Sequence, residues 1–377
     1  MRRKKAAMIK RNTIEFKLVS LVGLAGEIQT KDLFKLKYGK EYIRKVISNL
    51  KSVGYIRAYK FENIKCLRLT AKCKKYLKNS FPERFSDSFV GAKATNKIRN
   101  DARRRMRYHR LGEVLVLADL AGIKIFADEK SLMKKTQGLT RAVTTDKADY
   151  SVSNNSAEFY TSAELKAAGL FMNARTSRAL GIIYSHPDAY VIYNFGNELL
   201  RWESKTENSF LFRTVMMFSG TLDISPKLIC VGRNAEIAEK ILNSHGGNKK
   251  SFFKLNWHYN NIFFLDNSMF APEQLRYLIN KNLRGQVSSL IAEYFEVTKE
   301  YSIYGETEDG TIIANCTIGN LLTLKGIKET DLPNNKNIKI IHFSFQLPFL
   351  KKYLGNAENI EYHKIDARKI LYTEDTQ

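Results

Sequence analysis

The hydrophobic residues near the N-terminus follow the spacing of helices. Apolar side chains recur every three to four positions across residues 13–26 and again across residues 40–53, so each stretch predicts a helix with a buried face. Thr30 stands where it would cap a short helix over residues 31–37, which the Tyr38-Gly39 pair ends. The inner face of the third helix is expected to carry Tyr42, Val46, Ile47 and Leu50.

Strand-like residues follow the third helix. Gly54 ends that helix, and two short runs, 55–60 and 64–69, flank Glu62-Asn63 in the pattern of a β-hairpin. A further helix begins at Thr70. Three helices, a hairpin and a helix are the order of a winged helix-turn-helix, in which the third helix enters the major groove and the hairpin lies along phosphates.

From about residue 155 the spacing becomes that of a mixed α/β domain. The predicted order of elements matches the core of the PD-(D/E)xK nuclease-like fold. It is a helix at 111–122, three strands, a helix, a strand at 227–232 and a final helix. Beyond residue 250 strands and helices still alternate, and we expect this part to extend the central sheet rather than form a separate domain. The three consecutive strands are predicted at 178–185, 188–195 and 198–205.

The fold class predicted is therefore α/β with an N-terminal DNA-binding module. The expected parts are a winged helix-turn-helix at 1–80, a basic linker or helix at 81–110, a nuclease-like domain at 111–250 and an α/β extension of unassigned role at 251–377.

Positive charge is concentrated at the N-terminal end. Residues 1–110 hold 31 Lys or Arg and 8 Asp or Glu, a net charge of +23 out of +24 for the chain. A partner with a dense row of negative charge fits this pattern best, because Lys and Arg contacts to phosphate release counterions. We therefore expect double-stranded DNA as the partner, although a solvated basic linker is the alternative for residues 93–110.

The residues expected to contact DNA lie around the second and third helices, on the hairpin and in the arginine-rich stretch. They are Thr30, Lys37, Lys40, Tyr42, Arg44, Lys45, Asn49, Lys51, Arg57, Lys60, Lys65, Arg103, Arg104, Arg105 and Arg107.

Other compartments and partners are disfavoured. No apolar run is long enough to span a bilayer, and the basic segment has the pattern of a folded domain rather than of a membrane-surface helix, so no membrane partner is expected. The four cysteines are scattered without a paired spacing, which favours a reduced, cytoplasmic setting.

A metal site is the main catalytic candidate. Asp188 opens the second predicted strand of the central domain, and Glu203 and Lys205 close the third. With a turn at Phe195-Gly196, Asp188 would lie opposite Glu203 on one face, where two carboxylates could hold Mg²⁺ or Mn²⁺ while the Lys stabilises charge at the phosphate. Glu113 or Glu164 would complete the set.

Simpler explanations of these residues stay open. Acidic-x-Lys triplets also occur at 15–17, 128–130 and 164–166, so Glu203 and Lys205 are equally compatible with an exposed cross-strand pair. The chain has no P-loop and no His-x-His pair. A tyrosine nucleophile for DNA nicking is a further alternative. Its candidates near the predicted hairpin are Tyr160, Tyr184, Tyr190 and Tyr193.

A set of short segments in the first 220 residues carries a resemblance to known proteins. The segments are Thr30–Leu33, Tyr42–Lys51, Gly54–Ile56, Arg68–Ala71, Arg107–Glu113, Ser177–Gly181, Val191–Asn194 and Trp202. Through them the chain resembles, over roughly residues 13–220, the replication-relaxation family, winged-helix proteins of plasmids and integrative elements of Gram-positive bacteria. The resemblance implies a role in replication or DNA processing of a mobile element.

Two functions follow as hypotheses. In the first, the winged helix finds an origin-like site and the α/β part acts there as a metal-dependent nuclease or relaxase, alongside other transfer or replication proteins. In the second, the chain is a non-enzymatic binder: a replication initiator, an accessory relaxosome protein or a transcription regulator. A homodimer is compatible with either, because many winged helices bind paired half-sites.

Overall fold

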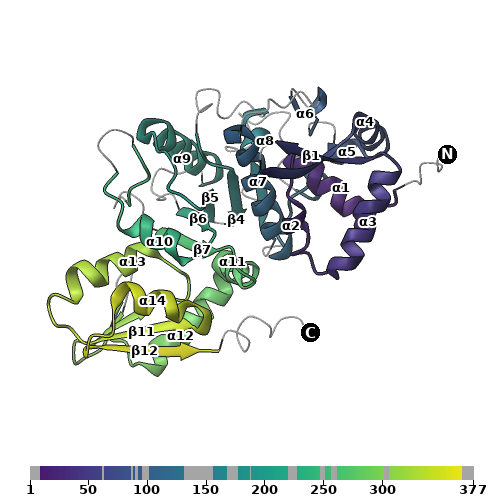
Figure 1. Cartoon of the computed structure of the whole chain (residues 1–377). Helices are drawn as coiled ribbons and strands as arrows, with labels where there is room; N and C mark the ends of the chain where they lie inside the picture. The colour runs from purple at the N-terminus through teal and green to yellow at the C-terminus, as the bar shows by residue number, and fades with distance from the viewer. Residues whose placement is uncertain are drawn as a thin grey trace. The chain divides into compact units, whose positions relative to one another are not determined.

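A computed structural model describes residues 9–366 apart from short gaps. The gaps are 62, 86–87, 90–91, 96–101, 131–155, 168–176, 187, 220–226, 247–250, 256–260 and 301–304. Contacts divide the chain into two compact units, Met1–Ala148 and Asp149–Gln377 (Figure 1). Both α-helices and β-sheets are present, so the chain is of the α/β type.

Unit 1 begins with three helices, and capping residues set both ends of the first one. The side chain of Thr13 accepts a hydrogen bond from the Phe16 amide at 3.2 Å and so starts α1, and Gly26 ends it at a positive φ of 86°. Nearly all residues of α1 are buried because its sequence is apolar on every side. The helices are α1 (Ile14–Ala25), α2 (Thr30–Leu33) and α3 (Lys40–Ser52).

An antiparallel hairpin follows α3. Strands β1 (Ile56–Phe61) and β2 (Ile64–Leu69) pair so that Lys60 lies opposite Lys65, and the Thr70 side chain then caps the next helix. The remaining helices of unit 1 are α4 (Ala71–Ser80), α5 (Pro82–Phe85), α6 (Ala92–Thr95), α7 (Ala102–Leu120) and the short 3₁₀ turn η1 (Ala127–Glu129).

The predicted order of three helices, a hairpin and a helix is confirmed, but three details were wrong. The second helix ends at Leu33, and Thr30 is its first residue rather than its cap. Tyr42 is 50% exposed, and Ile43 takes its place on the inner face of α3. The reason is helical periodicity, because Ile43 lies three, four and seven positions before the other buried residues of α3.

Unit 2 begins with a mixed five-stranded sheet in the order β3-β4-β5-β6-β7. Strand β4 runs antiparallel to β3 and β5, while β5, β6 and β7 are parallel. The strands are β3 (Glu158–Thr161), β4 (Gly181–Ser185), β5 (Asp188–Gly196), β6 (Lys227–Gly232) and β7 (Asn261–Asp266), and the helices are α8 (Ser162–Ala167), α9 (Ser204–Ser219) and α10 (Ala235–Leu242).

The strand predicted at 198–205 is wrong. The chain leaves the sheet after Gly196, Arg201 forms only an isolated bridge with Phe252, and α9 begins at Ser204. The neighbour of β5 on this side is the parallel strand β6, with Tyr190 opposite Lys227. The alternation in 198–205 arises instead from a loop that buries Leu200 and Trp202.

The C-terminal part builds a second sheet and does not extend the first. Its order is β12-β11-β10-β9-β8. Its strands are β8 (Lys299–Glu300), β9 (Gly305–Glu306), β10 (Ile312–Asn315), β11 (Ile338–Phe343) and β12 (Ile360–Ile365). The helical elements are α11 (Ala271–Ile279), α12 (Lys281–Tyr294), α13 (Leu321–Gly326), η3 (Ile327–Asp331), η4 (Ser344–Gln346) and α14 (Leu347–Leu354).

The two sheets of unit 2 share one topology. In each, three antiparallel strands are followed by two parallel strands that are reached through helices. Near the end of the third strand of each sheet, an asparagine side chain accepts the amide two residues later, Gly196 N to Asn194 Oδ1 at 2.8 Å and Thr317 N to Asn315 Oδ1 at 3.1 Å. This internal repeat has no obvious counterpart in the sequence.

Close packing in the first sheet gives a stability prediction. A Cβ at Gly181 would lie 2.1 Å from the Tyr160 carbonyl oxygen, whereas a Cβ at Gly285 in α12 would meet nothing within 4 Å. We expect Gly181→Ala to lower the free energy of unfolding of unit 2 by at least about 2 kcal/mol. Gly285→Ala should leave it unchanged or raise it by about 0.5–1 kcal/mol. Equal denaturation midpoints for the two variants would contradict this packing.

Candidate nucleic-acid interface

The outer face of α3 carries exposed cations. Its inner face is closed by Ile43, Val46, Ile47 and Leu50, so the polar residues between them face solvent. Arg44 forms an ion pair with Glu41 and lies 5.3 Å from the centre of the Phe34 ring, which fixes its direction. The exposed residues of the predicted DNA-contacting set here are Lys37, Lys40, Tyr42, Arg44, Lys45, Asn49 and Lys51, and Thr30 is half-buried.

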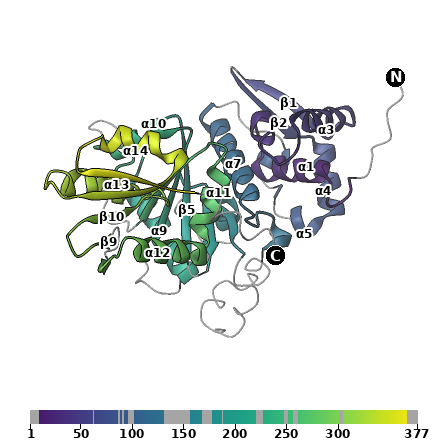
Figure 2. The same ribbon diagram turned by 90° about the horizontal axis from the view of Figure 1, so that it is seen from below.

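The hairpin adds cations on both of its faces. Lys60 and Lys65 are directly opposite each other near the turn and therefore share a face, whereas Arg57 lies on the other face, opposite Arg68. Lys60, Lys65 and Arg57 are all exposed. Figure 2 shows the hairpin projecting beyond the helices of unit 1. Strand β1 contacts α3, so the two groups of cations belong to one continuous part of unit 1.

The arginine-rich stretch is only partly at the surface. It forms the first turns of α7, in which Arg103 and Arg104 are exposed and Arg107 is half-buried. Arg105 is 1% exposed, so its expected place on a phosphate-contacting surface is wrong. It continues the buried stripe of α7 that includes His109 and Gly112, at helical spacing.

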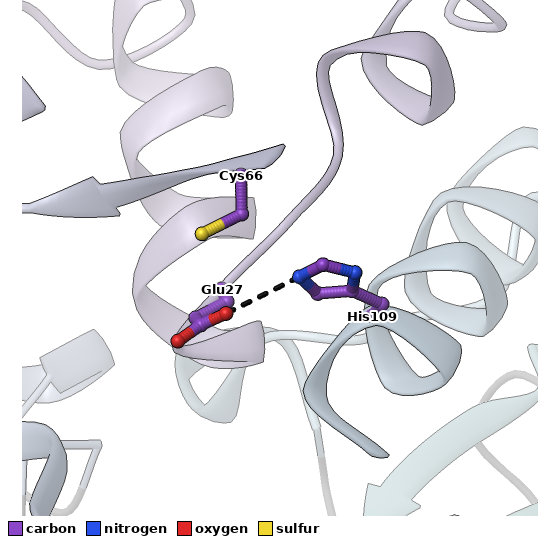
Figure 3. Close-up of side chains that lie close together, drawn as sticks. All are labelled: Glu27, Cys66 and His109. Atoms are coloured by element: carbon purple, nitrogen blue, oxygen red, sulfur yellow. Dashed lines mark hydrogen bonds and ion pairs between the residues drawn. The ribbon is translucent and has the colours of Figure 1, made fainter. Parts of the chain in front are cut away.

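Arg105 is buried because it neutralises Glu27, which is fully buried in the turn after α1. Arg105 Nε lies 3.1 Å and His109 Nε2 lies 3.2 Å from Glu27 Oε2, and Arg68 of β2 forms an ion pair with Oε1. Arg105 also donates to Cys66 Sγ at 3.1 Å. The cluster therefore joins the α1–α2 turn, the hairpin and α7, and Figure 3 shows three of its members.

Glu27, Cys66 and His109 are also close enough together to be considered as metal ligands. Burial alone would raise the pKa of Glu27, but hydrogen bonds from His109, Arg105 and Cys66 and the charge of Arg68 lower it to about 2. Burial and the Glu27 charge raise the pKa of Cys66 to about 11, so the thiol keeps its proton. With a protonated thiol and two guanidinium groups already at the carboxylate, this group fits a structural ion network better than a cation site.

Asp188, the first residue of the predicted nuclease triad, is also paired with cations. It accepts from Lys227 Nζ at 2.5 Å, Arg284 Nη2 at 2.8 Å and the Tyr190 hydroxyl at 3.0 Å. Burial would raise its pKa, yet Lys227 and Arg284 bring it below its usual value. Asp188 therefore ties β5 to β6 and α12. Pro187 lies outside the described residues.

The other members of the predicted triad do not meet Asp188. Glu203 follows Trp202, and the Trp202 ring packs on the Tyr193 ring with 5.0 Å between their centres. Tyr193 is five residues along β5 from Asp188, a distance of about 16 Å in a strand, so Glu203 lies near the opposite end of β5. Lys205 is exposed in the first turn of α9. The predicted pairing of Asp188 with Glu203 was wrong, because Asp188 pairs with Ser185 across the β4–β5 turn.

The two auxiliary carboxylates have local roles. Glu164 accepts the Thr161 amide at 2.7 Å while its own amide donates to the Thr161 hydroxyl at 3.2 Å, a capping box that starts α8. Glu113 lies on α7 in unit 1, where its charge acts on Asp32. Neither residue is thus shown beside Asp188.

The candidate tyrosine nucleophiles are all buried, and Tyr190 is fully so, which raises its pKa. A buried carboxylate that sequence reasoning missed is Glu207. It accepts the Ser177 hydroxyl at 2.8 Å, the Tyr193 hydroxyl at 3.0 Å and the Arg178 amide at 2.6 Å. No spacing in the sequence distinguishes it from the other acidic residues, since its partners come from distant segments.

Comparisons of the chain with protein-family models, with curated proteins and with solved structures found no match. Among the described residues, every helix is too short or too polar to cross a membrane.

The Glu27 cluster predicts that two nearby arginines of α7 differ sharply in their contribution to the stability of unit 1. Arg105→Ala would leave the buried Glu27 carboxylate with one partner fewer and should destabilise unit 1 by on the order of 3 kcal/mol. Arg103→Ala removes an exposed side chain and should change stability by less than about 0.5 kcal/mol. Chemical denaturation measures both, and a similar small effect at the two positions would show that the buried pair is not required.

Asp32 of α2 is the second unusual carboxylate of unit 1. It is 1% exposed, and its Oδ2 atom has no hydrogen-bond partner among the described residues. Burial and the charge of Glu113 raise its pKa to about 7, despite Lys31 and Lys35 nearby. The folded state therefore binds this proton more tightly than the unfolded chain.

This shift predicts a pH dependence of stability. The raised pKa of Asp32 favours folding below about pH 4, and that advantage is lost as the pH rises to about 7. Asp32→Asn should therefore be more stable than the wild type at pH 8, by on the order of 3 kcal/mol, with a smaller difference at pH 5. Glu41→Gln, which neutralises an exposed acid, is the control. A constant difference between pH 5 and pH 8 would contradict the ionisation of a buried Asp32.

Proposed function

We propose that this chain is a DNA-binding protein whose N-terminal unit is a winged helix-turn-helix. The observation that carries the proposal is that the exposed faces of α3 and of the hairpin are both basic, within the 110 residues that hold nearly all of the net charge. Cations at these two places are what a helix in the major groove and a wing along phosphates require.

The element order of unit 1 supports the same proposal. A short α2, a turn and the amphipathic α3 precede a two-stranded hairpin whose Lys60 and Lys65 sit near its tip. The Glu27 cluster anchors strand β2 of this hairpin through Cys66 and Arg68. An anchored strand lets the hairpin present its cations in a defined direction, which a phosphate-contacting wing needs.

Between the two hypotheses for unit 2, the geometry favours binding without cleavage. The order of three antiparallel strands, a helix and a parallel strand supports a nuclease-like core, as the proposed fold of the central domain. However, its carboxylate Asp188 is already held by Lys227 and Arg284, and Glu203 lies elsewhere. A Mg²⁺ or Mn²⁺ ion would need at least two free carboxylates in one place.

The biological setting we propose rests on the resemblance to the replication-relaxation family. The chain would recognise a site on a mobile element and take part in its replication or transfer as an initiator or accessory protein. Metal-dependent nicking is the second candidate, and it depends on a rearrangement of Asp188.

DNA binding is tested by removing one cation from each candidate surface. Lys45→Ala and Lys60→Ala should weaken binding to a random-sequence duplex and reduce the slope of log affinity against log salt by about 1 each. Lys205→Ala, an exposed lysine of unit 2, is the control and should change neither. Fluorescence anisotropy over a salt series makes the measurement. Unchanged slopes for both unit 1 variants would overturn the proposed interface.

Cleavage is tested on supercoiled plasmid with Mg²⁺ or Mn²⁺. We expect no nicking by the wild type above the level of Asp188→Asn. Nicking that both Asp188→Asn and Glu203→Gln abolish, with DNA binding retained, would instead establish the nuclease.

A further inference from the structure

Strand β12 is an open edge of the second sheet. It is six residues long, pairs with β11 on one side, and has no strand on its other side among the described residues. The opposite edge, β8, has only two residues. An edge of this length presents a row of backbone donors and acceptors to any strand that can pair with it.

An apolar cavity lies along the same edge. It has a volume of about 540 Å³ and is bounded by α12 and by the ends of β11 and β12. Leu290 and Tyr294 of α12 line it and are 60% and 77% exposed. Large apolar side chains with this much exposure, beside an open strand, indicate a surface that another chain covers.

We propose that β12 and this cavity are where a second copy of the chain docks, with the two β12 strands pairing antiparallel about a two-fold axis. The two five-stranded sheets would then form one continuous sheet. Such an axis is perpendicular to the sheet, so paired residues must point to the same side and their positions must both be odd or both be even. The axis therefore passes midway between one residue and the same residue of the second copy, and in the middle of β12 that residue is either Tyr362 or His363.

The side chains of β12 favour the axis at Tyr362. Glu361 then lies opposite the second copy's His363, and the reciprocal pair forms as well. Within one strand His363 Nε2 is buried and already lies 2.9 Å from Glu361 Oε1, so an axis at Tyr362 would bring two such acid–imidazole pairs together. With the axis at His363, two imidazoles would face each other and Glu361 would meet Ile365.

With the axis at Tyr362, the second copy also covers the cavity. Residues 361, 363 and 365 share the face of the sheet on which α12 packs, as shown by the pairing of Phe343 with Ile365 and the packing of both with Val287 and Ile291. A perpendicular two-fold axis keeps both α12 helices on this face. Leu290 and Tyr294 would then be buried beside their counterparts rather than left in water.

The oligomeric state tests the proposal without DNA. Sedimentation velocity of the full-length chain between about 1 and 100 µM should show a dimer for the wild type. Leu290→Asp should raise the dissociation constant of the dimer at least tenfold. Met269→Asp is the matched control, because Met269 is 80% exposed and lies outside the cavity. It should remain dimeric, and unchanged melting temperatures would show that both variants fold.

The register is tested by cross-linking. Tyr362→Cys should form a disulfide-linked dimer on oxidation, and His363→Cys should not. The Tyr362 hydroxyl also donates to the Gly355 carbonyl, so a second pair of cysteine variants leaves Tyr362 unchanged. A mixture of Ile360→Cys and Lys364→Cys should cross-link between the two variants, while each alone stays uncross-linked. The four native cysteines are buried, and the wild type measures their background.

Three results would overturn the proposal. A monomeric wild type at 100 µM excludes a second copy at this edge. A dimer that Leu290→Asp leaves intact, with no cross-link at residue 362 or between 360 and 364, places the contact elsewhere. A monomeric wild type that becomes dimeric when the chain is ended after Asp366 shows that the chain's own C-terminal residues cover the cavity.

Discussion

The burial of the Glu27 carboxylate is the constraint on which unit 1 depends. A carboxylate taken out of water is stable only with opposite charge and hydrogen bonds close by. Here those partners come from β2 and from α7, which are 41 and 78 residues away along the chain. The cluster therefore fixes the hairpin and α7 against the α1–α2 turn at the same point. It also explains why a stretch with five arginines does not lie wholly at the surface.

The same physical rule changes how the acidic residues of unit 2 are interpreted. Asp188 has the sequence position of a metal ligand, yet Lys227 and Arg284 supply the positive charge that a cation would otherwise bring. A structural ion cluster and a metal site both begin with a buried carboxylate, and only the neighbours distinguish them. Those neighbours come from β6 and α12, so no local motif could have shown which of the two is present.

Local patterns predicted most elements but not their long-range pairing. Helices α1, α3 and α4 and the hairpin follow from apolar spacing, Gly54 and the capping residue Thr70. Strands β5 and β6 were equally clear because each is a short apolar run. The loop at 198–203 misled because burying Leu200 and Trp202 imitates strand alternation. The wrong strand then produced a wrong pairing of Asp188 with Glu203, whereas predicting the exposed cations of α3 required no strand pairing.

The repeated topology of unit 2 gives the open edge of β12 a structural explanation. Strand β7 occupies the last position of the first sheet, as β12 does in the second. The edge of β7 is covered, because the Phe264 amide donates to the Gly319 carbonyl at 2.9 Å and Phe263 forms a bridge with Asn320. Both covering residues belong to the second repeat, just before α13. A third repeat would cover β12 in the same way, and the described residues contain none. Within the described residues, the two repeats thus cover the edge of β7 internally and leave the equivalent edge of β12 without a pairing strand.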